Sequence, residues 1–235
     1  MKAKIQKVFD SLSTVYENQV DDSSFYNTQY ERPGMLAELE QELHGKKILD
    51  AGCAAGWYAN ELLLRGADVT AVDVSPQMIA ATKRRIGDRG KALCLDLEEP
   101  LPFPDSSFDL IISSLTLHYL QDWTKVFAEF NRVLKSGEEY LFSVHHPFMD
   151  INISENKCYF ETEALTDIWN KQGKEFEVPM YRRPLQDIIN ETTKAFTLTA
   201  IKELQPTAKL KELKAESYQY LMNNPHFLLI KAKKQ

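Results

Sequence analysis

The sequence predicts a doubly wound α/β fold built around a mostly parallel sheet. From residue 47 to residue 145, short apolar runs rich in β-branched residues alternate with segments whose apolar residues recur at helical spacing. Turn and capping residues separate the two kinds of segment. Strands and helices in this alternation form right-handed crossover units, which make the strands parallel and place helices on both faces of the sheet.

The first elements follow one another directly. A short apolar run ends at Asp50 and a glycine-rich loop, and Gly66 closes the helix that comes next. Ser75 is placed to cap the following helix, with Pro76 in its first turn and Gly87 after its end. The expected elements are strand 47–50, helix 57–65, strand 68–73, helix 76–86, strand 91–95 and strand 108–113.

The alternation of strands and helices continues after the fourth strand and ends at the fifth. Asp122 is placed to cap a helix over 123–134, and Gly137 separates that helix from a fifth strand over 139–144. From His146 to Arg183 the chain is aromatic, charged and irregular, which indicates an insertion that covers the carboxyl edge of the sheet. Beyond it we expect helix 184–195, strand 196–204, one helix after Pro206 and strand 226–232.

Composition and charge disfavour several classes of protein. The net charge of −6 disfavours nucleic-acid binding, because contacts to phosphate supply most of that affinity. No stretch approaches the roughly 20 apolar residues of a membrane span, and the N-terminus lacks the apolar run of a signal sequence. Cys53, Cys94 and Cys158 are far apart and odd in number, which argues against disulfides or a zinc site. We therefore expect a cytoplasmic protein without a metal.

The loop from Asp50 to Gly56 carries the first chemical signal. Ligands bind at the carboxyl ends of parallel strands, and glycine lets the backbone approach a ligand closely. The helix that follows offers unpaired N–H groups to a carboxylate or phosphate. A dinucleotide fingerprint, however, requires glycine where this chain has Ala54 and Trp57. An NAD-dependent enzyme is therefore disfavoured, and no Gly-Lys-Ser/Thr of a phosphate loop follows.

Acidic residues follow the next two strands. Asp73 lies about twenty residues after the loop, where an acid binds ribose hydroxyls, and Val74 and Met78 beside it can flank a base. Asp96, followed by Leu97, comes after the third strand and can accept from the exocyclic amine of adenine. Each acid alone is equally well explained as a turn or cap residue. Together with the loop they favour a nucleoside ligand that lacks a pyrophosphate.

Four motifs carry a family resemblance. They are Ile48–Gly56, Ala71–Met78, Asp96–Asp109 and Arg132–Gly137. In these motifs the chain resembles the class I S-adenosylmethionine-dependent methyltransferases, and within them the small-molecule group related to the ubiquinone/menaquinone-biosynthesis enzymes. The resemblance covers residues 45–145 and extends more loosely to Tyr26-Asn27, Glu31–Pro33 and Arg183–Leu185.

The resemblance implies a Rossmann-like sheet of seven strands with an antiparallel last strand, and a role for each matching residue. S-adenosyl-L-methionine would be the cofactor and S-adenosyl-L-homocysteine the product. Asp50, Ala51, Gly52, Cys53 and Gly56 would hold the methionine part, Asp73 the ribose, and Asp96 and Leu97 the adenine. Ser113 would lie near the sulfonium, and Tyr26 and Arg32 would close over the cofactor.

The chain departs from the family pattern at two places. Ala54 replaces the middle glycine of the loop, which is tolerated if its φ angle is negative. Ser136-Gly137-Glu138 replaces a Pro-Gly-Gly turn, which we interpret as structural.

One domain with four parts is expected. These are an N-terminal helical lid over 1–44 with helices over 5–16 and 35–43, a cofactor-binding core over 45–145, an acceptor-side insertion over 146–183, and the rest of the sheet over 184–235.

Three histidines near the carboxyl edge are candidate bases. His118 follows the fourth strand, and His145 and His146 end the fifth. A base is required if the acceptor is a hydroxyl, an acidic carbon or a protonated amine, and the pKa of histidine suits that task. His118 is equally well explained by packing, and only one of two adjacent strand residues is expected to face the site. The three lack the spacing of metal ligands.

The expected function is methyl transfer to a small-molecule acceptor by in-line displacement. One alternative is a module that binds the cofactor without catalysis, since Asp73, Asp96 and the loop glycines serve binding alone. Another is an RNA or protein methyltransferase, which is disfavoured because Ser113–Thr116 stands where many base-modifying enzymes have Asn/Asp-Pro-Pro-Tyr. Arg182 or Arg183 in the insertion either pairs with an acidic acceptor or is surface charge. The acceptor, the methylated atom and the oligomeric state stay open.

Overall fold

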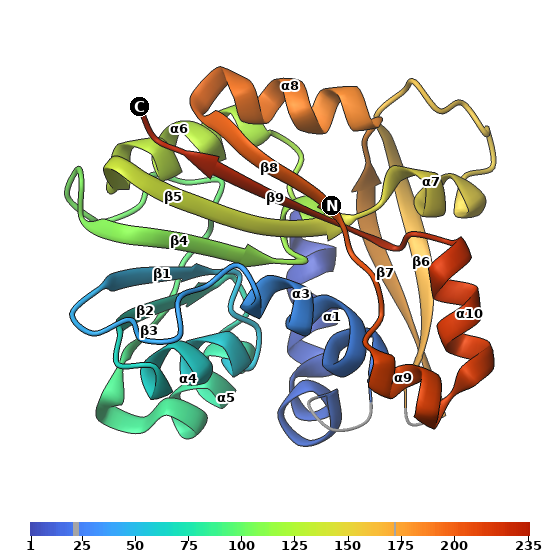
Figure 1. Cartoon of the computed structure of the whole chain (residues 1–235), viewed down its shortest axis with the longest axis horizontal. Helices are drawn as coiled ribbons and strands as arrows, with labels where there is room; N and C mark the ends of the chain where they lie inside the picture. Colours follow the sequence, from blue (N-terminus) through green and yellow to red (C-terminus); the bar gives the residue numbers. More distant parts are fainter. Residues whose placement is uncertain (21–23, 172) are drawn as a thin grey trace.

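The computed structural model describes residues 1–20, 24–171 and 173–235 (Figure 1). Residues 21–23 of the expected lid and residue 172 of the expected insertion lie outside the described residues. The main sheet has seven strands in the order β3-β2-β1-β4-β5-β9-β8. They are β1 (Lys47–Ala51), β2 (Asp68–Asp73), β3 (Lys91–Cys94), β4 (Phe108–Ser114), β5 (Leu134–His145), β8 (Thr197–Glu203) and β9 (Phe227–Lys233).

The strand directions confirm the predicted fold class. Strands β3, β2, β1, β4 and β5 pair in parallel, and β9 pairs antiparallel with both β5 and β8. The chain's last strand therefore inserts between β5 and β8. The strand order reverses between β1 and β4, which is the point where a doubly wound sheet opens a crevice for a ligand.

Helices cover both faces of the sheet. Ile48 packs with α4 (Trp57–Leu64) and α5 (Pro76–Ile86) on one face. The next residue, Leu49, packs with α6 (Trp123–Val133) on the other, where α8 (Leu185–Ala195) also lies. Adjacent strand residues point to opposite faces, so these two side chains serve two separate cores.

The predicted helix starts are confirmed by their capping contacts. The Ser75 hydroxyl oxygen accepts a hydrogen bond from the backbone N–H of Met78 at 3.1 Å. The Asp122 carboxylate accepts from the N–H of Thr124 at 3.0 Å. Each contact satisfies one of the N–H groups that a helix start leaves unpaired.

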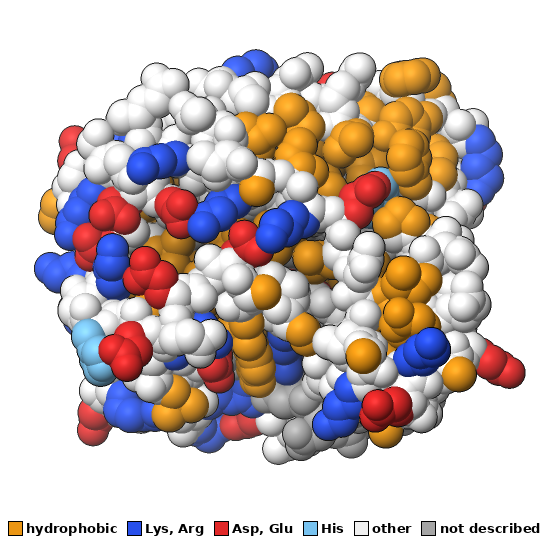
Figure 2. Space-filling view, in the orientation of Figure 1, with side chains coloured by type: hydrophobic (Ala, Val, Ile, Leu, Met, Phe, Trp, Pro, Cys, Tyr) orange, Lys and Arg blue, Asp and Glu red, His pale blue; other side chains and the backbone are white. Residues whose placement is uncertain are grey.

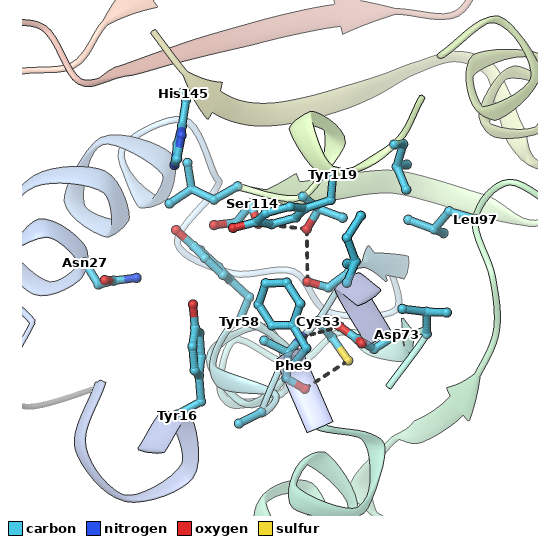
Figure 3. Close-up of a pocket in the computed structure, with 18 of the residues that line it drawn as sticks. Phe9, Tyr16, Asn27, Cys53, Tyr58, Asp73, Leu97, Ser114, Tyr119 and His145 are labelled. Atoms are coloured by element: carbon cyan, nitrogen blue, oxygen red, sulfur yellow. Dashed lines mark hydrogen bonds between the residues drawn. The ribbon is translucent and has the colours of Figure 1, made fainter. Parts of the chain in front are cut away.

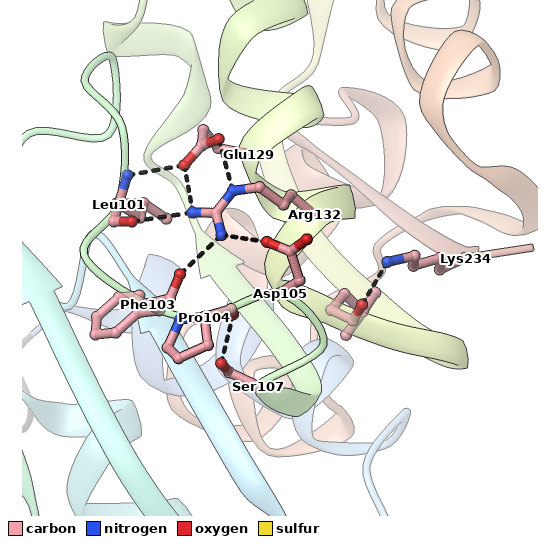
Figure 4. Close-up of polar contacts among 9 residues, drawn as sticks. Leu101, Phe103, Pro104, Asp105, Ser107, Glu129, Arg132 and Lys234 are labelled. Carbon is pink, nitrogen blue, oxygen red and sulfur yellow. Dashed lines mark hydrogen bonds and ion pairs between the residues drawn. The ribbon is translucent and has the colours of Figure 1, made fainter.

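Two of the family motifs meet away from the sheet's carboxyl edge (Figure 4). Arg132 in α6 donates to the carbonyl oxygens of Leu101 at 2.9 Å and Phe103 at 2.7 Å, and it pairs with Asp105 and Glu129. These contacts fix the loop between β3 and β4 against α6. The motif therefore has a structural role in this chain.

The lid begins with α1 (Lys2–Val15), close to the predicted helix. The prediction of a second helix there, over residues 35–43, is wrong. The chain forms the π-helical turn η2 (Asn27–Glu31) and a short α3 (Arg32–Leu36) instead. Leu39 and Leu43 are spaced like residues on one face of a helix because both are buried, but each packs from irregular backbone. After Pro206 the chain likewise forms two helices, α9 (Ala208–Leu213) and α10 (Ala215–Asn223), in place of the one predicted.

The insertion is more regular than predicted. It contains α7 (Pro147–Asp150), the turn η5 (Ile151–Ile153) and a hairpin of β6 (Glu163–Lys171) and β7 (Lys174–Arg182). Charged residues interrupt the period-two pattern of these strands. The hairpin stands beside the carboxyl edge of the main sheet, and Ile5 of α1 packs against it (Figure 1). The insertion carries four exposed large apolar side chains, those of Phe148, Ile153, Phe160 and Ile168. Figure 2 shows hydrophobic side chains gathered over part of this surface.

No helix in the described ranges is long and apolar enough to cross a membrane.

Candidate functional site

A cavity of about 670 Å³ lies at the carboxyl ends of β1, β2, β4 and β5 (Figure 3). Its floor is the loop after β1, and its other walls come from α1, the segment around η2 and the β6–β7 hairpin. A volume of this size is typical of small-molecule sites. Ten of the predicted site residues line it: Tyr26, Arg32, Asp50, Gly52, Cys53, Asp73, Val74, Asp96, Leu97 and His145.

Six predicted site residues do not line the cavity. The Ser113 hydroxyl donates to the carbonyl oxygen of Ala51 at 2.9 Å, and its neighbour Ser114 lines the cavity instead. Met78 is buried against α1. Ser113 points away from the cavity because adjacent residues of a strand face opposite sides of the sheet, and Met78 lies on the buried face of α5. The six are Ala51, Gly56, Met78, Ser113, His118 and His146.

The loop geometry requires glycine at position 52. Gly52 has a φ angle of +85°, and a Cβ atom there would lie 2.2 Å from the Thr116 hydroxyl oxygen. Neither the backbone conformation nor the space accepts a side chain. Gly52 thereby lets the loop pass close to the segment that follows β4.

Ala54 also adopts a left-handed backbone conformation, with a φ angle of +46°. The condition under which alanine was expected to be tolerated here, a negative φ angle, is therefore not met. The backbone N–H of Ala54 donates to Asp73 at 3.0 Å, and its carbonyl accepts from the Thr82 hydroxyl at 2.8 Å. These two contacts hold the residue in a conformation that costs an L-residue about 1–2 kcal/mol.

Replacing Ala54 by glycine is expected to stabilise the protein by about 0.5–1 kcal/mol. The relief of left-handed strain exceeds the extra entropy that glycine gives the unfolded chain. Urea unfolding of Ala54→Gly measures the difference. The matched control is Ala55→Gly, because Ala55 is not among the residues with positive φ and should be destabilised by the change. A loss of stability in both variants would contradict the strain argument.

Two buried carboxyl groups meet beside the loop. Asp50 is 1% exposed, and burial, reinforced by the charge of Asp73, raises its pKa to about 7. Burial also raises the pKa of Asp73 to about 6, although the N–H groups of Ser75 and Ala54 donate to its carboxylate. Oδ2 of Asp50 has no hydrogen-bond partner among the described residues. Both acids are therefore suited to a ligand that brings donors or positive charge.

The third acid, Asp96, follows β3 and also lines the cavity. Asp96 accepts from the backbone N–H of Glu98 at 2.9 Å and forms an ion pair with Lys2 at the start of α1. Lys2 and Met1 line the cavity here, so the first turn of α1 covers the region next to Leu97.

Sequence reasoning missed Glu31, which anchors the lid. Its carboxylate is fully buried and accepts from three hydroxyls, those of Tyr58 at 2.8 Å, Ser114 at 2.8 Å and Ser143 at 2.6 Å. Burial raises its pKa although these three donors oppose the shift. The contacts join η2 to α4, β4 and β5. The loose resemblance at Glu31–Pro33 was the one signal in the sequence.

Lid residues pack against aromatic side chains of the core to form further walls of the cavity. The guanidinium of Arg32 lies 3.9 Å from the centre of the Trp57 ring, and both residues line the cavity. Phe9 and Tyr119 meet edge to face at 5.0 Å between ring centres. Tyr119 follows the predicted His118, but nothing in its spacing marked it as a wall of the site.

The three candidate histidines take different positions. His145 lines the cavity, and its Nδ1 lies 3.3 Å from an oxygen of Asp150. The His118 ring is buried and stacks on the His145 ring at 4.0 Å. His146 faces away from the cavity, and its Nε2 lies 3.0 Å from Glu203.

The pKa values of these imidazoles differ accordingly. Burial alone lowers the pKa of His145, but the charge and hydrogen bond of Asp150 outweigh burial, so the pKa is raised. Burial holds the pKa of His118 well below its usual value. His118 and His146 were predicted as bases, but neither reaches the cavity.

Neither insertion arginine borders the cavity. Arg182 is buried and donates to the carbonyl oxygens of Cys158, Tyr159 and Glu161. Arg183 donates to the carbonyls of Leu120 and Gln121. Arg182 therefore braces the insertion internally, and Arg183 holds the insertion to the segment that follows β4. In the part of the chain that the structure describes, no group of three or more His, Cys, Asp or Glu side chains is placed to hold a metal ion.

Comparisons with known proteins agree on one class of enzyme. Residues 49–142 match a family described as "Methyltransferase domain". An uncharacterized protein of Haemophilus influenzae is 28% identical over 176 residues, which cover 72% of this chain and 65% of that protein. A malonyl-[acyl-carrier protein] O-methyltransferase of Erwinia billingiae is 36% identical over 111 residues, which cover 46% of this chain and 42% of that protein. The matches thus span less than two thirds of the length of these curated relatives.

Solved structures extend the likeness to most of the chain. The crystal structure of a proposed S-adenosylmethionine-dependent methyltransferase from Listeria monocytogenes superposes with a TM-score of 0.74 and 25% identity. The superposition covers 87% of this chain and 96% of the Listeria chain.

Proposed function

We propose that this chain, which carries a class I S-adenosylmethionine-dependent methyltransferase domain, transfers the cofactor's methyl group to a small molecule, and that both bind in the cavity described above. The observation that carries the proposal is the composition of that cavity. The glycine loop and three acids at successive strand ends line one part of it, and His145 with several aromatic rings lines another. One enclosed space thus offers groups for a cofactor and for an acceptor.

The residues present fit the proposed cofactor. Among the described residues, none forms a hydrogen bond to the buried Oδ2 of Asp50, which suits the ammonium of the methionine part. Asp73 at the end of β2 suits two ribose hydroxyls, and Asp96 with Leu97 suits adenine. An adenine amine at Asp96 would take the place of Lys2, so α1 is expected to shift when the cofactor binds.

The protein's part in the reaction is mainly alignment. When bound, the cofactor supplies an electrophilic methyl group. The lid and the β6–β7 hairpin exclude water and hold the acceptor beside the loop. His145 is the one predicted base that borders the cavity, and it would take a proton from the acceptor.

A small acceptor is supported by the way the cavity is enclosed. Phe9 of α1, Tyr26 of the lid and Trp169 of the hairpin all line it, so an RNA or protein substrate would have to displace several elements. The name of the curated relatives, malonyl-[acyl-carrier protein] O-methyltransferase, supports oxygen as the methylated atom.

A methyl-transfer screen tests the proposal. The native chain is incubated with S-adenosylmethionine and small phenols, quinols, amines or carboxylates, and formation of S-adenosylhomocysteine is measured. We expect product formation that depends on one class of acceptor. Cofactor binding without any acceptor-dependent turnover would favour a module that binds the cofactor without catalysis.

Cofactor affinity is expected to fall as the pH falls below about 7. Asp50 must be ionised to pair with an ammonium group, and its pKa in the unliganded protein is about 7. Below that pH, each further unit of pH is expected to lower the affinity for the cofactor by up to about tenfold. Titration calorimetry at pH 8, 7, 6 and 5.5 measures the trend, and Asp50→Asn should bind weakly with a flatter profile. A constant affinity over this range in the native protein would contradict the assignment of Asp50.

A further inference from the structure

His145 and Asp150 form a pair at the end of the cavity opposite the acids. His145 is the last residue of β5, and Figure 3 shows its ring pointing from that strand into the cavity. Asp150 is the last residue of α7 and is 8% exposed. Its oxygen lies 3.3 Å from Nδ1 of the imidazole. The pair thus joins the main sheet to the insertion.

The contact selects one form of the imidazole. An ionised carboxylate only accepts hydrogen bonds, so its place beside Nδ1 favours the tautomer that carries the proton on Nδ1. The other ring nitrogen, Nε2, then holds a lone pair on the opposite edge of the ring. No described residue forms a hydrogen bond to Nε2. A neutral His145 therefore offers a proton acceptor within the lining of the cavity.

The charges around His145 favour its protonated form after proton transfer. Asp150 faces it from α7, and Asp167 acts on it from β6. His118 in the turn η4 (Leu117–Tyr119) stacks on the ring, and His226 lies before β9. Burial lowers the pKa of both of these histidines, so they add no positive charge near neutral pH.

The neighbouring histidine provides an internal comparison. His146 also pairs with a carboxylate, that of Glu203, but the pair lies outside the cavity. A histidine–carboxylate contact is therefore not by itself the signal. What distinguishes His145 is that its contact with a carboxylate occurs on the one predicted base that lines the cavity, beside aromatic side chains.

We propose that Asp150 is a positioning residue that makes Nε2 of His145 the proton acceptor, and that the substrate is a hydroxylated aromatic small molecule. This inference rests on the proposed methyltransferase function. A carboxylate acceptor is already ionised at neutral pH and needs no base, whereas a phenolic hydroxyl must lose its proton. Phe9, Tyr119 and Trp169 line the same cavity and suit a planar ring.

The step balances within these groups. The hydroxyl oxygen forms a bond to the methyl carbon while its O–H bond breaks and the proton passes to Nε2 of His145. The carbon–sulfur bond breaks, and its electron pair stays on sulfur in the neutral thioether. Asp150 stabilises the imidazolium until the proton is released to water.

Nuclear magnetic resonance of the unliganded protein tests the positioning role without any substrate. Long-range ¹H–¹⁵N correlations of His145 are recorded against pH for the native chain, Asp150→Asn and the matched control Glu203→Gln. We expect the Nδ1–H tautomer in the native chain and in Glu203→Gln. We expect a lower pKa and a mixture of tautomers in Asp150→Asn. An Nε2–H tautomer in the native chain, or an unchanged pKa in Asp150→Asn, would overturn the proposal.

Turnover tests the acceptor class. Catechol and hydroquinone are compared with benzoate and malonate at a fixed concentration of S-adenosylmethionine. We expect turnover of the hydroxylated rings, with an acidic limb of kcat/KM that moves to lower pH in Asp150→Asn and stays in place in Glu203→Gln. Methylation of carboxylates alone, or of neither hydroxylated ring, would overturn this acceptor class. If the proposed function itself were wrong, the native chain would bind no S-adenosylmethionine, and this result differs from turnover of the wrong acceptor class.

Discussion

Replacing Asp73 by alanine is expected to weaken the binding of S-adenosylmethionine by about 100-fold or more. The carboxylate stands at the end of β2 and accepts from the N–H groups of Ala54 and Ser75 at 3.0 and 2.9 Å. It thus orders the glycine loop and is placed to hold the ribose. Hydrogen bonds to a charged group contribute about 1.5–3 kcal/mol each, and 1.4 kcal/mol is tenfold in affinity. Titration calorimetry measures the loss.

The control lies on the same strand. Asp68 is exposed at the first residue of β2, at the opposite end from the cavity, and Asp68→Asn should bind like the native chain. Circular dichroism establishes whether both variants are folded. If Asp73→Ala does not fold, Asp73→Asn replaces it in the test, because asparagine keeps the side-chain volume of aspartate. An affinity of Asp73→Ala within threefold of the native value would refute the ribose assignment.

Replacing His145 by glutamine is expected to lower kcat by about 100-fold while leaving cofactor affinity unchanged. A positioned base typically contributes 10²–10⁴-fold, and glutamine keeps polar groups at the site but takes up no proton near neutral pH. His145 lies away from Asp73, so cofactor contacts should survive (Figure 3). Single-turnover rates with an acceptor from the screen, together with calorimetry, separate the two effects.

His146→Gln is the matched control for this prediction. The side chain is next in sequence but faces away from the cavity and pairs with Glu203. We expect a loss of stability, since a buried group is changed, with kcat per folded molecule near the native value. Full activity in His145→Gln would show that the base has been assigned wrongly.

The parallel core could be predicted because its signals are local. Ser75 and Asp122 mark helix starts by their own hydrogen-bonding chemistry, and β4 between them is an apolar run buried on both faces. The acids at the strand ends could be located for the same reason, since a parallel sheet brings all such ends to one edge.

The remaining features depend on tertiary contacts. The β6–β7 hairpin pairs Trp169 with Phe176 across two strands that also carry many charges, so its pattern resembles a loop. The left-handed Ala54 is held by Asp73 and Thr82, residues about 20 and 30 positions away. No local rule anticipates either arrangement.

The same limit applies within the site. Strand alternation predicts that only one of His145 and His146 faces the cavity, and the structure agrees, but the choice depends on how β5 pairs with β9. The buried Glu31 was missed because its partners, Tyr58, Ser114 and Ser143, come from three other elements.

Direct titration of the native chain with S-adenosylmethionine tests the central claim, that this cavity is built for a methyl donor. We predict one site per chain, competition by S-adenosylhomocysteine, and no comparable binding of NAD. The absence of saturable heat, or tighter binding of NAD than of S-adenosylmethionine, would contradict the account.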